Sequence, residues 1–239
     1  MPSRRSPGAQ NAPTVFTEGR ATTATGTYET IPLRTDASWP PPGTRNVSLH
    51  LGRDTAGGTL TTTAGPSSQA SYTDLSTTTE EVAKATPQAE LSWLSYASPA
   101  LARDVRMADR AVLEVLIKVD RASAHLTPVL IDVAPNGTWR TVSRTFLDLA
   151  YRDGLATPKP VPVNQPLRAK VEFKPQDHTF RAGHRIGLLM QSSNTIWAVP
   201  DTPGATVTVL HQRRVSGAVT SGLHLPLVSP PARSAMFVQ

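Results

Sequence analysis

The sequence predicts an all-β protein, an antiparallel β-sandwich of the jelly-roll type, and three observations support this prediction. First, apolar side chains recur at every second position in several short segments, as in a strand with one buried face. Second, no segment of about ten residues keeps an apolar period typical of a helix. Third, the 239 residues include 22 prolines and 15 glycines, which favour turns between strands.

The clearest alternation spans residues 167–173, where Leu, Ala, Val and Phe alternate with Arg, Lys and Glu. A second strand is predicted after Gly183, which supplies the backbone freedom for a tight turn. Ile186, Leu188 and Met190 follow this glycine at period two. We expect both strands to pack one face on a shared core.

The N-terminal part of the chain divides by composition. Residues 1–26 are rich in Ser, Thr, Pro, Gly and Ala, which predicts a flexible arm, and residues 27–239 are expected to form the sandwich. Within the sandwich, residues 28–33 are expected to form an edge strand and residues 46–51 a second strand. Residues 57–90 contain few large apolar side chains, so we expect a long surface excursion there.

The densest strand signals lie in the middle of the chain. Strands are predicted around residues 91–96, 113–119 and 127–133. Pro135-Asn136-Gly137 predicts a hairpin turn, because Asn and Gly tolerate positive φ values, and residues 139–144 should return antiparallel. Further on, we expect loops at 147–166 and 192–204, a strand at 206–210, and a weak edge in the tail after residue 216.

Charge and cysteine content limit the possible partners. The formal net charge is +6, but the basic residues are scattered and no basic run alternates with aromatic residues, so we expect no nucleic-acid partner. The chain has no cysteine, which excludes disulfides and thiolate chemistry. No apolar segment has the length of a signal peptide or a membrane span. We therefore expect no membrane partner and a cytoplasmic location as written, or an extracellular one within a longer secreted enzyme.

Known catalytic motifs are absent from the sequence. The G-x-S-x-G motif places a serine nucleophile on a sharp turn, but Gly65-Pro66-Ser67-Ser68-Gln69 lacks the second glycine. Dinucleotide and phosphate-loop motifs are also missing. The sequence therefore predicts no catalytic residue and no cofactor.

His178 and His184 flank the Gly183 turn, with Asp177 adjacent, so a metal site or a catalytic His/Asp pair was considered. Metal ligation needs three or four converging ligands, and this spacing brings together two imidazoles at most. The preferred interpretation is that His184 hydrogen-bonds the turn backbone and that His178 lies at the surface. No metal site is predicted.

Aromatic residues raise the possibility of sugar binding. Trp93 and Trp139 lie in strand-like segments and are expected in the core, whereas Trp39 and Trp197 lie in loops near prolines. We therefore regard Trp39, Trp197 and the loop residue Asn194 as candidate contacts for a ligand or for another domain.

Several segments, taken in order, resemble one known family. They are Trp39-Pro40-Pro41, Leu94-Ser95-Tyr96, residues 98–105, the strand at 112–119, residues 130–133 with the turn at 135–137, and residues 180–186. This ordered set resembles the C-terminal non-catalytic domain of the X-Pro dipeptidyl-peptidase and cocaine-esterase-like serine hydrolases. The resemblance implies a galactose-binding-like jelly-roll sandwich, in agreement with the strand pattern.

The resemblance also implies a function. In this family, a Ser-Asp-His triad lies on an α/β-hydrolase domain that precedes the sandwich, and no part of that domain is found in this chain. We therefore expect an accessory domain that is inactive alone and whose partner is an α/β-hydrolase domain, in cis in the family or in trans here. Two alternatives stay open: a free-standing module that binds carbohydrate or peptide, and a gene fragment that exposes a former interdomain face.

Overall fold

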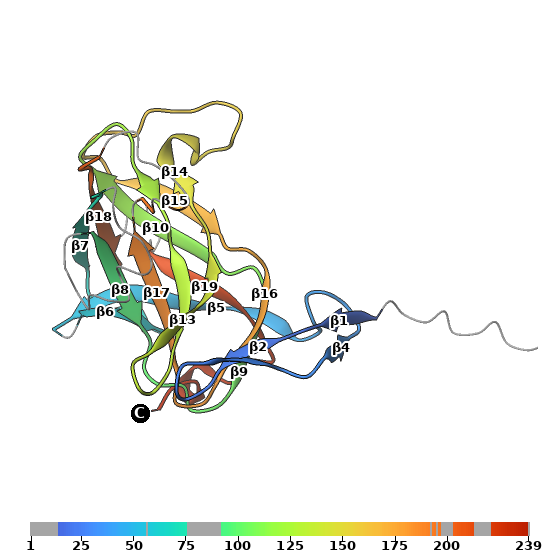
Figure 1. The fold of residues 1–239 in the computed structure, drawn as a ribbon. Coiled ribbons are helices and arrows are strands. Elements are labelled where there is room, and N and C mark those ends of the chain that lie inside the picture. The colour runs from blue at the N-terminus through green and yellow to red at the C-terminus, as the bar shows by residue number, and fades with distance from the viewer. Residues whose placement is uncertain are drawn as a thin grey trace, which may run out of the picture.

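The computed structural model describes residues 14–55, 57–75, 92–191, 193–194, 196, 203–212 and 221–238. Within these ranges the protein is built from strands, and the helical elements are two short 3₁₀ turns, η1 (Leu149–Tyr151) and η2 (Arg233–Ala235). Figure 1 shows the strands gathered into one twisted β body. The all-β prediction is therefore confirmed.

Most strands belong to one continuous hydrogen-bonded path, and a branch and two small sheets complete the fold. The path runs through β13 (Trp139–Arg144), β12 (Val129–Val133), β17 (Arg185–Gln191), β8 (Trp93–Ala97), β6 (Gly57–Thr61), β5 (Thr44–Asp54), β19 (Gly222–Val228), β9 (Val105–Asp109), β16 (Gln176–Phe180), β2 (Arg20–Thr22) and β3 (Tyr28–Thr30). The branch consists of β10 (Val112–Val119) with partners β15 (Leu167–Glu172), β18 (Thr206–His211) and β19, and of β18 with β7 (Ser68–Thr73). The small sheets are β1 (Val15–Thr17) with β4 (Arg34–Asp36), and β11 (His125–Leu126) with β14 (Leu147–Asp148).

The core follows the alternation that the sequence shows. On β10, Leu113, Val115 and Ile117 are fully buried. The strand pairs antiparallel with β15, whose Ala169 and Val171 are also buried. Leu113 lies opposite Val171 and Val115 opposite Ala169, so the two neighbouring strands present one common apolar face to the core.

A smaller apolar cluster lies apart from the main core. It consists of Trp93, Val129, Ile131 and Leu189, with Val133 and Trp139 packed against it at partial burial. These residues come from β8, β12, β17 and β13. Along β12, Val129 and Ile131 of this cluster alternate with Leu130 of the main core. The expectation that Trp93 is a core residue is confirmed, and Trp139 is half-buried beside it.

The predicted hairpin is confirmed. β12 and β13 pair antiparallel, and the N–H of Gly137 donates to the carbonyl of Ala134 at 2.9 Å. Gly137 has φ +84°, whereas Asn136 stays outside the positive-φ region and accepts a hydrogen bond from the Thr138 N–H. The turn thus uses the glycine for its left-handed backbone and the asparagine as a side-chain acceptor.

Two strands occupy the segment for which a surface excursion was predicted. β6 and β7 lie within residues 57–75, and residues 76–90 of that segment lie outside the described residues. On β7, Ala70 and Tyr72 point inward and are buried, while the alternate positions carry Ser, Gln and Thr. The sequence did not predict this strand because its small and polar side chains weaken the alternation of apolar and polar residues.

The tail prediction was wrong in a similar way. β19 is an interior strand that pairs with β5 on one side and with β10 and β9 on the other. Pro226 argued against an interior strand, but it lies between the β10 pairings, which reach His224, and the β9 pairing at Leu227. The N–H that proline lacks therefore falls where the pairing of β19 changes from β10 to β9.

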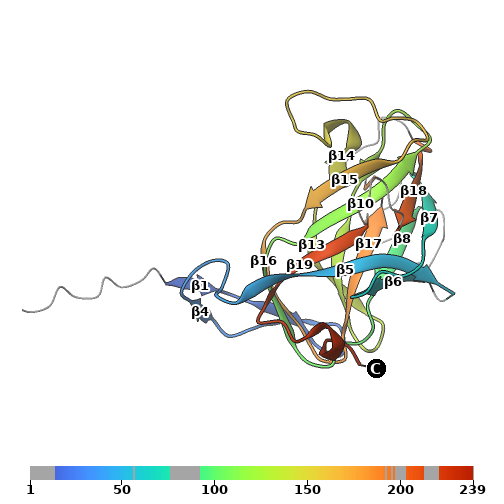
Figure 2. The same ribbon diagram turned by 180° about the vertical axis from the view of Figure 1, so that it is seen from behind.

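The flexible arm expected over residues 1–26 contains paired strands in its described part. Strand β2 joins β16 in parallel, and β1 pairs with β4. Figures 1 and 2, which show opposite sides of the molecule, both place the β1–β4 pair beyond the end of the sandwich. Residues 1–13 lie outside the described residues.

Candidate functional site

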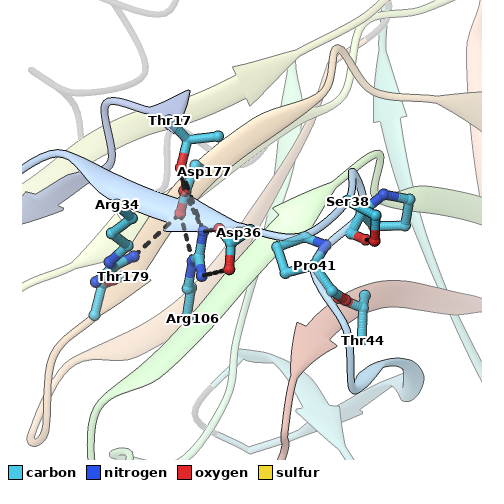
Figure 3. Close-up of polar contacts among 10 residues, drawn as sticks. Thr17, Arg34, Asp36, Ser38, Pro41, Thr44, Arg106, Asp177 and Thr179 are labelled. Carbon is cyan, nitrogen blue, oxygen red and sulfur yellow. Dashed lines mark hydrogen bonds and ion pairs between the residues drawn. The ribbon is translucent and has the colours of Figure 1, made fainter. Parts of the chain in front are cut away.

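The β1–β4 pair turns its charged side chains toward the sandwich and the aromatic side chain of Phe16 away from it. In both strands the central residue is exposed and its two neighbours are half-buried. Thr17, Arg34 and Asp36 point toward β9 and β16, as Figure 3 shows. Phe16, paired with Thr35, lies on the opposite face and is 63% exposed. In a typical sheet in water the aromatic residue would be buried and the charged residues exposed, so the burial of this pair is inverted.

Arg106 of β9 is the centre of the contacts on the polar face. Its Nε donates to Asp177 Oδ1 at 2.9 Å and its Nη2 donates to Asp177 Oδ2 at 2.6 Å, so the two side chains meet in a bidentate pair. The same Nη2 donates to Asp36 Oδ2 at 2.7 Å. Arg106 therefore joins strands β9, β16 and β4 (Figure 3).

Two further donors complete this ion cluster, which we define as Thr17, Arg34, Asp36, Arg106 and Asp177. Arg34 Nη1 donates to Asp177 Oδ1 at 3.2 Å, and the Thr17 hydroxyl donates to Asp177 Oδ2 at 2.5 Å. The Asp177 side chain is only 4% exposed. A carboxylate this deeply buried requires paired charges and hydrogen bonds, and the ion cluster provides both.

The electrostatics of the ion cluster favour the charged forms. Burial would raise the pKa of the Asp177 carboxyl, but hydrogen bonds from Arg106 and Thr17 and the charges of Arg106 and Arg34 outweigh it, so this pKa lies below its ordinary value. The hydrogen bond to Asp177 is the main cause that raises the pKa of Arg106 above its ordinary value. Asp177 and Arg106 thus favour their charged forms near neutral pH.

The sequence-predicted histidines meet on a carboxylate that sequence reasoning did not select. Asp132 of β12 lies 2.8 Å from His178 Nε2 through its Oδ2 and 2.8 Å from His184 Nδ1 through its Oδ1. All three side chains are buried. The expectation that His178 lies at the surface was wrong, and the ring of His184 bonds Asp132 and not the turn backbone. Strand alternation explains this, because neighbouring residues face opposite sides: Asp177 faces the ion cluster and His178 the core.

No group of three or more metal-ligating side chains that could hold a metal ion occurs among the described residues. The Asp132 cluster offers one carboxylate and two imidazoles, and each imidazole already uses one ring nitrogen on that carboxylate. Its arrangement is that of a buried cross-link between strands.

A serine, a histidine and an acid also meet near the end of β17, but their order differs from that of a catalytic triad. The Ser193 hydroxyl donates to Asp74 Oδ2 at 2.7 Å and lies 3.4 Å from His125 Nδ1. In a triad the histidine lies between the acid and the serine, whereas here the serine lies between the acid and the histidine. Ser193 is also 1% exposed. This contact joins loops and does not present a nucleophile to solvent.

The candidate contact residues from the sequence are placed as follows. Trp39 is half-buried in the turn after β4. Asn194 is 1% exposed, and its Oδ1 accepts a hydrogen bond from the N–H of Ile196. It also lines a small pocket of about 60 Å³ with Phe146 and Lys174. Trp197 lies outside the described residues.

Sequence reasoning missed Arg106 and Asp36 altogether. Each is a charged residue in a short strand segment, VRMAD or RTD, with no motif around it. The one available signal was the alternation of Asp177 with His178, which predicts opposite faces without naming a partner for either residue.

The fold and these contacts define a β-sandwich domain whose described polar clusters join strands and loops. The chain belongs to the family described as the X-Pro dipeptidyl-peptidase C-terminal non-catalytic domain, whose family model matches residues 7–230. It is thus the non-catalytic domain type of hydrolases that carry their catalytic domain elsewhere. No helix of the described residues is long and apolar enough to cross a membrane.

Two curated relatives bear the name "Putative Xaa-Pro dipeptidyl-peptidase". The protein from Bacillus anthracis is 24% identical over 126 residues, which cover 52% of this chain and 21% of the relative. The protein from Rhodopirellula baltica is 25% identical over 143 residues, which cover 57% of this chain and 23% of the relative. The matched segment thus makes up only about a fifth of the length of these relatives.

Solved structures share the fold. An aminopeptidase from a Thaumarchaeota archaeon of marine sediment matches with a TM-score of 0.65 at 17% identity, covering 87% of this chain and 40% of that chain. An α-amino acid ester hydrolase matches with a TM-score of 0.63 at 18% identity, covering 92% of this chain and 42% of that chain. These similarities support the sandwich fold.

Proposed function

We propose that this chain is the accessory β-sandwich of a serine hydrolase that releases X-Pro dipeptides or cleaves acyl esters, and that it packs on an α/β-hydrolase catalytic domain. Membership of the non-catalytic C-terminal domain family supports the accessory role. The names of the curated relatives support a peptidase activity for the parent enzyme. The sequence-based expectation of no nucleophile agrees with this role.

The inverted β1–β4 pair is the observation that carries the docking part of the proposal. Phe16 is 63% exposed, and Leu33, just before β4, is 66% exposed. Exposed large apolar side chains favour a partner that removes them from water. The ion cluster holds the other face of the pair on the sandwich, so Phe16 and Leu33 are presented on a fixed support.

The position of this pair in the chain fits a catalytic domain as the partner. In this family the sandwich is the C-terminal domain, so the catalytic domain precedes it. The β1–β4 pair contains the first described strand, and it projects from the body of the sandwich (Figure 2). We propose that the catalytic domain covers Phe16 and Leu33, and that Trp39, in the turn that follows β4, belongs to the same contact. Asn194 and Trp197 are proposed as a separate contact with a ligand or with that domain.

We also propose that the partner is a hydrolase domain, in cis or in trans, and not nucleic acid or a membrane surface. The scattered positive charge supports this choice, because nucleic-acid binding requires basic residues gathered along a path. We propose that the location follows that of the parent enzyme, which is either cytoplasmic or extracellular.

Photo-crosslinking in the native host tests the docking proposal. A photo-reactive phenylalanine analogue is placed at Phe16 in one sample and at Leu155 in the other, since Leu155 is 86% exposed on a loop far along the chain. Mass spectrometry then identifies the cross-linked peptides. We expect peptides of an α/β-hydrolase domain carrying G-x-S-x-G with the analogue at Phe16 and none with Leu155. Equal yields, or no hydrolase peptide at Phe16, would contradict the proposal.

A chromogenic assay tests the accessory role itself. The purified chain is incubated with Gly-Pro p-nitroanilide and with p-nitrophenyl acetate, in the presence and absence of a serine-directed inhibitor. We expect no hydrolysis that the inhibitor removes. Inhibitor-sensitive turnover by the chain alone would show that it carries its own catalytic centre.

A further inference from the structure

A pocket of about 180 Å³ opens between β5, β6, β7, β8 and the end of β18, away from the ion cluster. Its wall includes Arg53, Ser95, Tyr96 and His211. Gly58 lets β6 approach β8 closely at this wall, since a Cβ there would collide with the backbone carbonyl of Ser95. The volume equals about six times the share of one water molecule in the liquid, which suits a small organic molecule.

Two buried side chains in the wall form a hydrogen-bonded chain with a serine. The Tyr96 hydroxyl lies 2.8 Å from His211 Nε2, and the Ser68 hydroxyl lies 3.0 Å from His211 Nδ1. Tyr96 is 2% exposed and His211 is 0% exposed. Both ring nitrogens of His211 are therefore occupied by hydroxyl groups.

Because the His211 ring is neutral, one of the two hydroxyl groups bonded to it keeps a hydrogen that it does not donate to the ring. Burial lowers the pKa of His211 to about 4, with a further lowering by the charge of Arg53, so the ring is neutral near pH 7. A neutral imidazole donates from one nitrogen and accepts at the other. One hydroxyl thus donates to the ring while the other accepts from it. When Nε2 carries the hydrogen, Tyr96 accepts from it, and the hydrogen of the Tyr96 hydroxyl is then not used on the ring.

Arg53 supplies the only charge that lines the pocket among the described residues. Its side chain is exposed at the rim and makes no ion pair or hydrogen bond with another described residue. It is close enough to lower the pKa of His211, and it also lowers that of Tyr96, which burial raises above its ordinary value. No acidic side chain of the described residues lines the wall. The wall formed by the described residues is thus positive, with neutral hydroxyl groups and a guanidinium that has no described partner.

We propose that this pocket is a binding site for a small organic carboxylate. The guanidinium of Arg53 pairs with the carboxylate, because its fork of N–H donors matches two carboxylate oxygens. The Tyr96 hydroxyl donates to an acceptor on the same ligand. Its hydrogen bond to His211, which also bonds Ser68, holds the hydroxyl in place. Exclusion of acidic groups from the wall favours an anion over its neutral amide. This site is independent of the β1–β4 pair, so it stands or fails separately from the docking proposal.

The test is a titration of the ¹⁵N-labelled chain followed by ¹H–¹⁵N NMR, with N-acetylglycine as the carboxylate and N-acetylglycinamide as its matched neutral analogue. We expect saturable shifts of the amides of Gly57, Gly58 and Ser95 with the carboxylate, and none with the amide. Arg53→Gln should weaken binding at least about tenfold, since it removes a charge-assisted pair. Arg53→Lys should retain part of the affinity.

Arg168→Gln is the control, because it removes an exposed positive charge on β15 away from the pocket. It should leave binding unchanged. Arg53 is exposed, so the spectrum of Arg53→Gln should keep the dispersion of the folded protein. The proposal is overturned by equal shifts with both compounds, by unchanged affinity in Arg53→Gln, or by the absence of saturable shifts at these amides.

Discussion

The carboxylate of Asp132 lies 2.8 Å from Nε2 of His178, and this contact joins two strands that stand far apart along the hydrogen-bonded path. β12 lies near one end of the path and β16 near the other, so their contact closes the sandwich across its core. The second oxygen of Asp132 bonds His184 in the turn before β17. One buried carboxylate thus connects β12 with β16, which is not its ladder partner, and with the turn that leads into β17, which is.

Loss of this carboxylate should destabilise the fold strongly. Asp132→Ala leaves two buried imidazoles without their partner, and we expect the free energy of unfolding to fall by about 3–5 kcal/mol. Asp132→Asn keeps the shape and one or two hydrogen bonds, so the loss should be smaller. Urea unfolding measures both. Asp153→Ala is the control, because Asp153 pairs with Lys159 on the surface; a loss in Asp132→Ala no larger than in this control would refute the cross-link.

The ion cluster should fix the β1–β4 pair to the sandwich. Arg106→Met leaves Asp36 and Asp177 without their shared guanidinium, so we expect the pair to detach and the free energy of unfolding to fall by about 3 kcal/mol. Hydrogen exchange should show lost protection in β1 and β4 while β10 stays protected. Arg110→Gln removes an arginine from an exposed pair with Glu172, and it should leave exchange in β1 and β4 unchanged. Full protection of β1 and β4 in Arg106→Met would contradict this role.

The sequence allowed the prediction of strands whose inward positions carry large apolar side chains, as in β10 and β15. It did not reveal β7, where Ala70 and Tyr72 alternate with small polar residues, or β16, where the buried residues include His178 and Thr179. Periodicity measures hydrophobicity, so it fails where buried positions are polar or small. Burial of such residues depends on partners that other strands supply.

The site contacts were less predictable than the strands, for a related reason. Asp132 stands in the apolar strand VLIDV on the same face as Leu130 of the core, and an acid on a core face indicates a buried partner. That pattern could have selected Asp132. Its partner histidines, and the Asp36 partner of Arg106, come from distant segments whose register is set only when the sandwich forms.

Acid should remove the stabilisation that the ion cluster provides, because it protonates Asp177. The pKa of this carboxyl lies below its value of 3.8 in an unfolded chain, because the hydrogen bonds and charges of the arginines outweigh burial. The unfolded state therefore binds the proton more readily, and the stabilisation that is present above pH 3.8 is lost as the pH falls below it. Asp177→Asn should flatten this acid limb in urea unfolding between pH 5 and the acid transition. An acid limb with the wild-type slope in Asp177→Asn would contradict the assignment.

A second pH dependence should come from His211, at higher pH than that of Asp177. Burial lowers the pKa of this imidazole from 6.5 to about 4, with a smaller lowering by Arg53. Between these two values the unfolded state binds a proton that the folded state does not, so the stability is complete above pH 6.5 and decreases as the pH falls toward 4. The loss should reach about 3 kcal/mol at most, from the size of the shift.

The double variant His211→Phe/Tyr96→Phe isolates this contribution, because it removes the titrating ring together with the hydroxyl that would otherwise lose its partner. Its free energy of unfolding at pH 7 will differ from that of the wild type, but the decrease between pH 7 and pH 4.5 should become shallower. His224→Gln is the matched control, since His224 also bonds a serine, Ser48, from a half-buried position on β19. It should keep the wild-type slope. If the double variant keeps that slope too, burial does not hold His211 neutral. The argument that the lining of the carboxylate pocket is neutral would then fail as well.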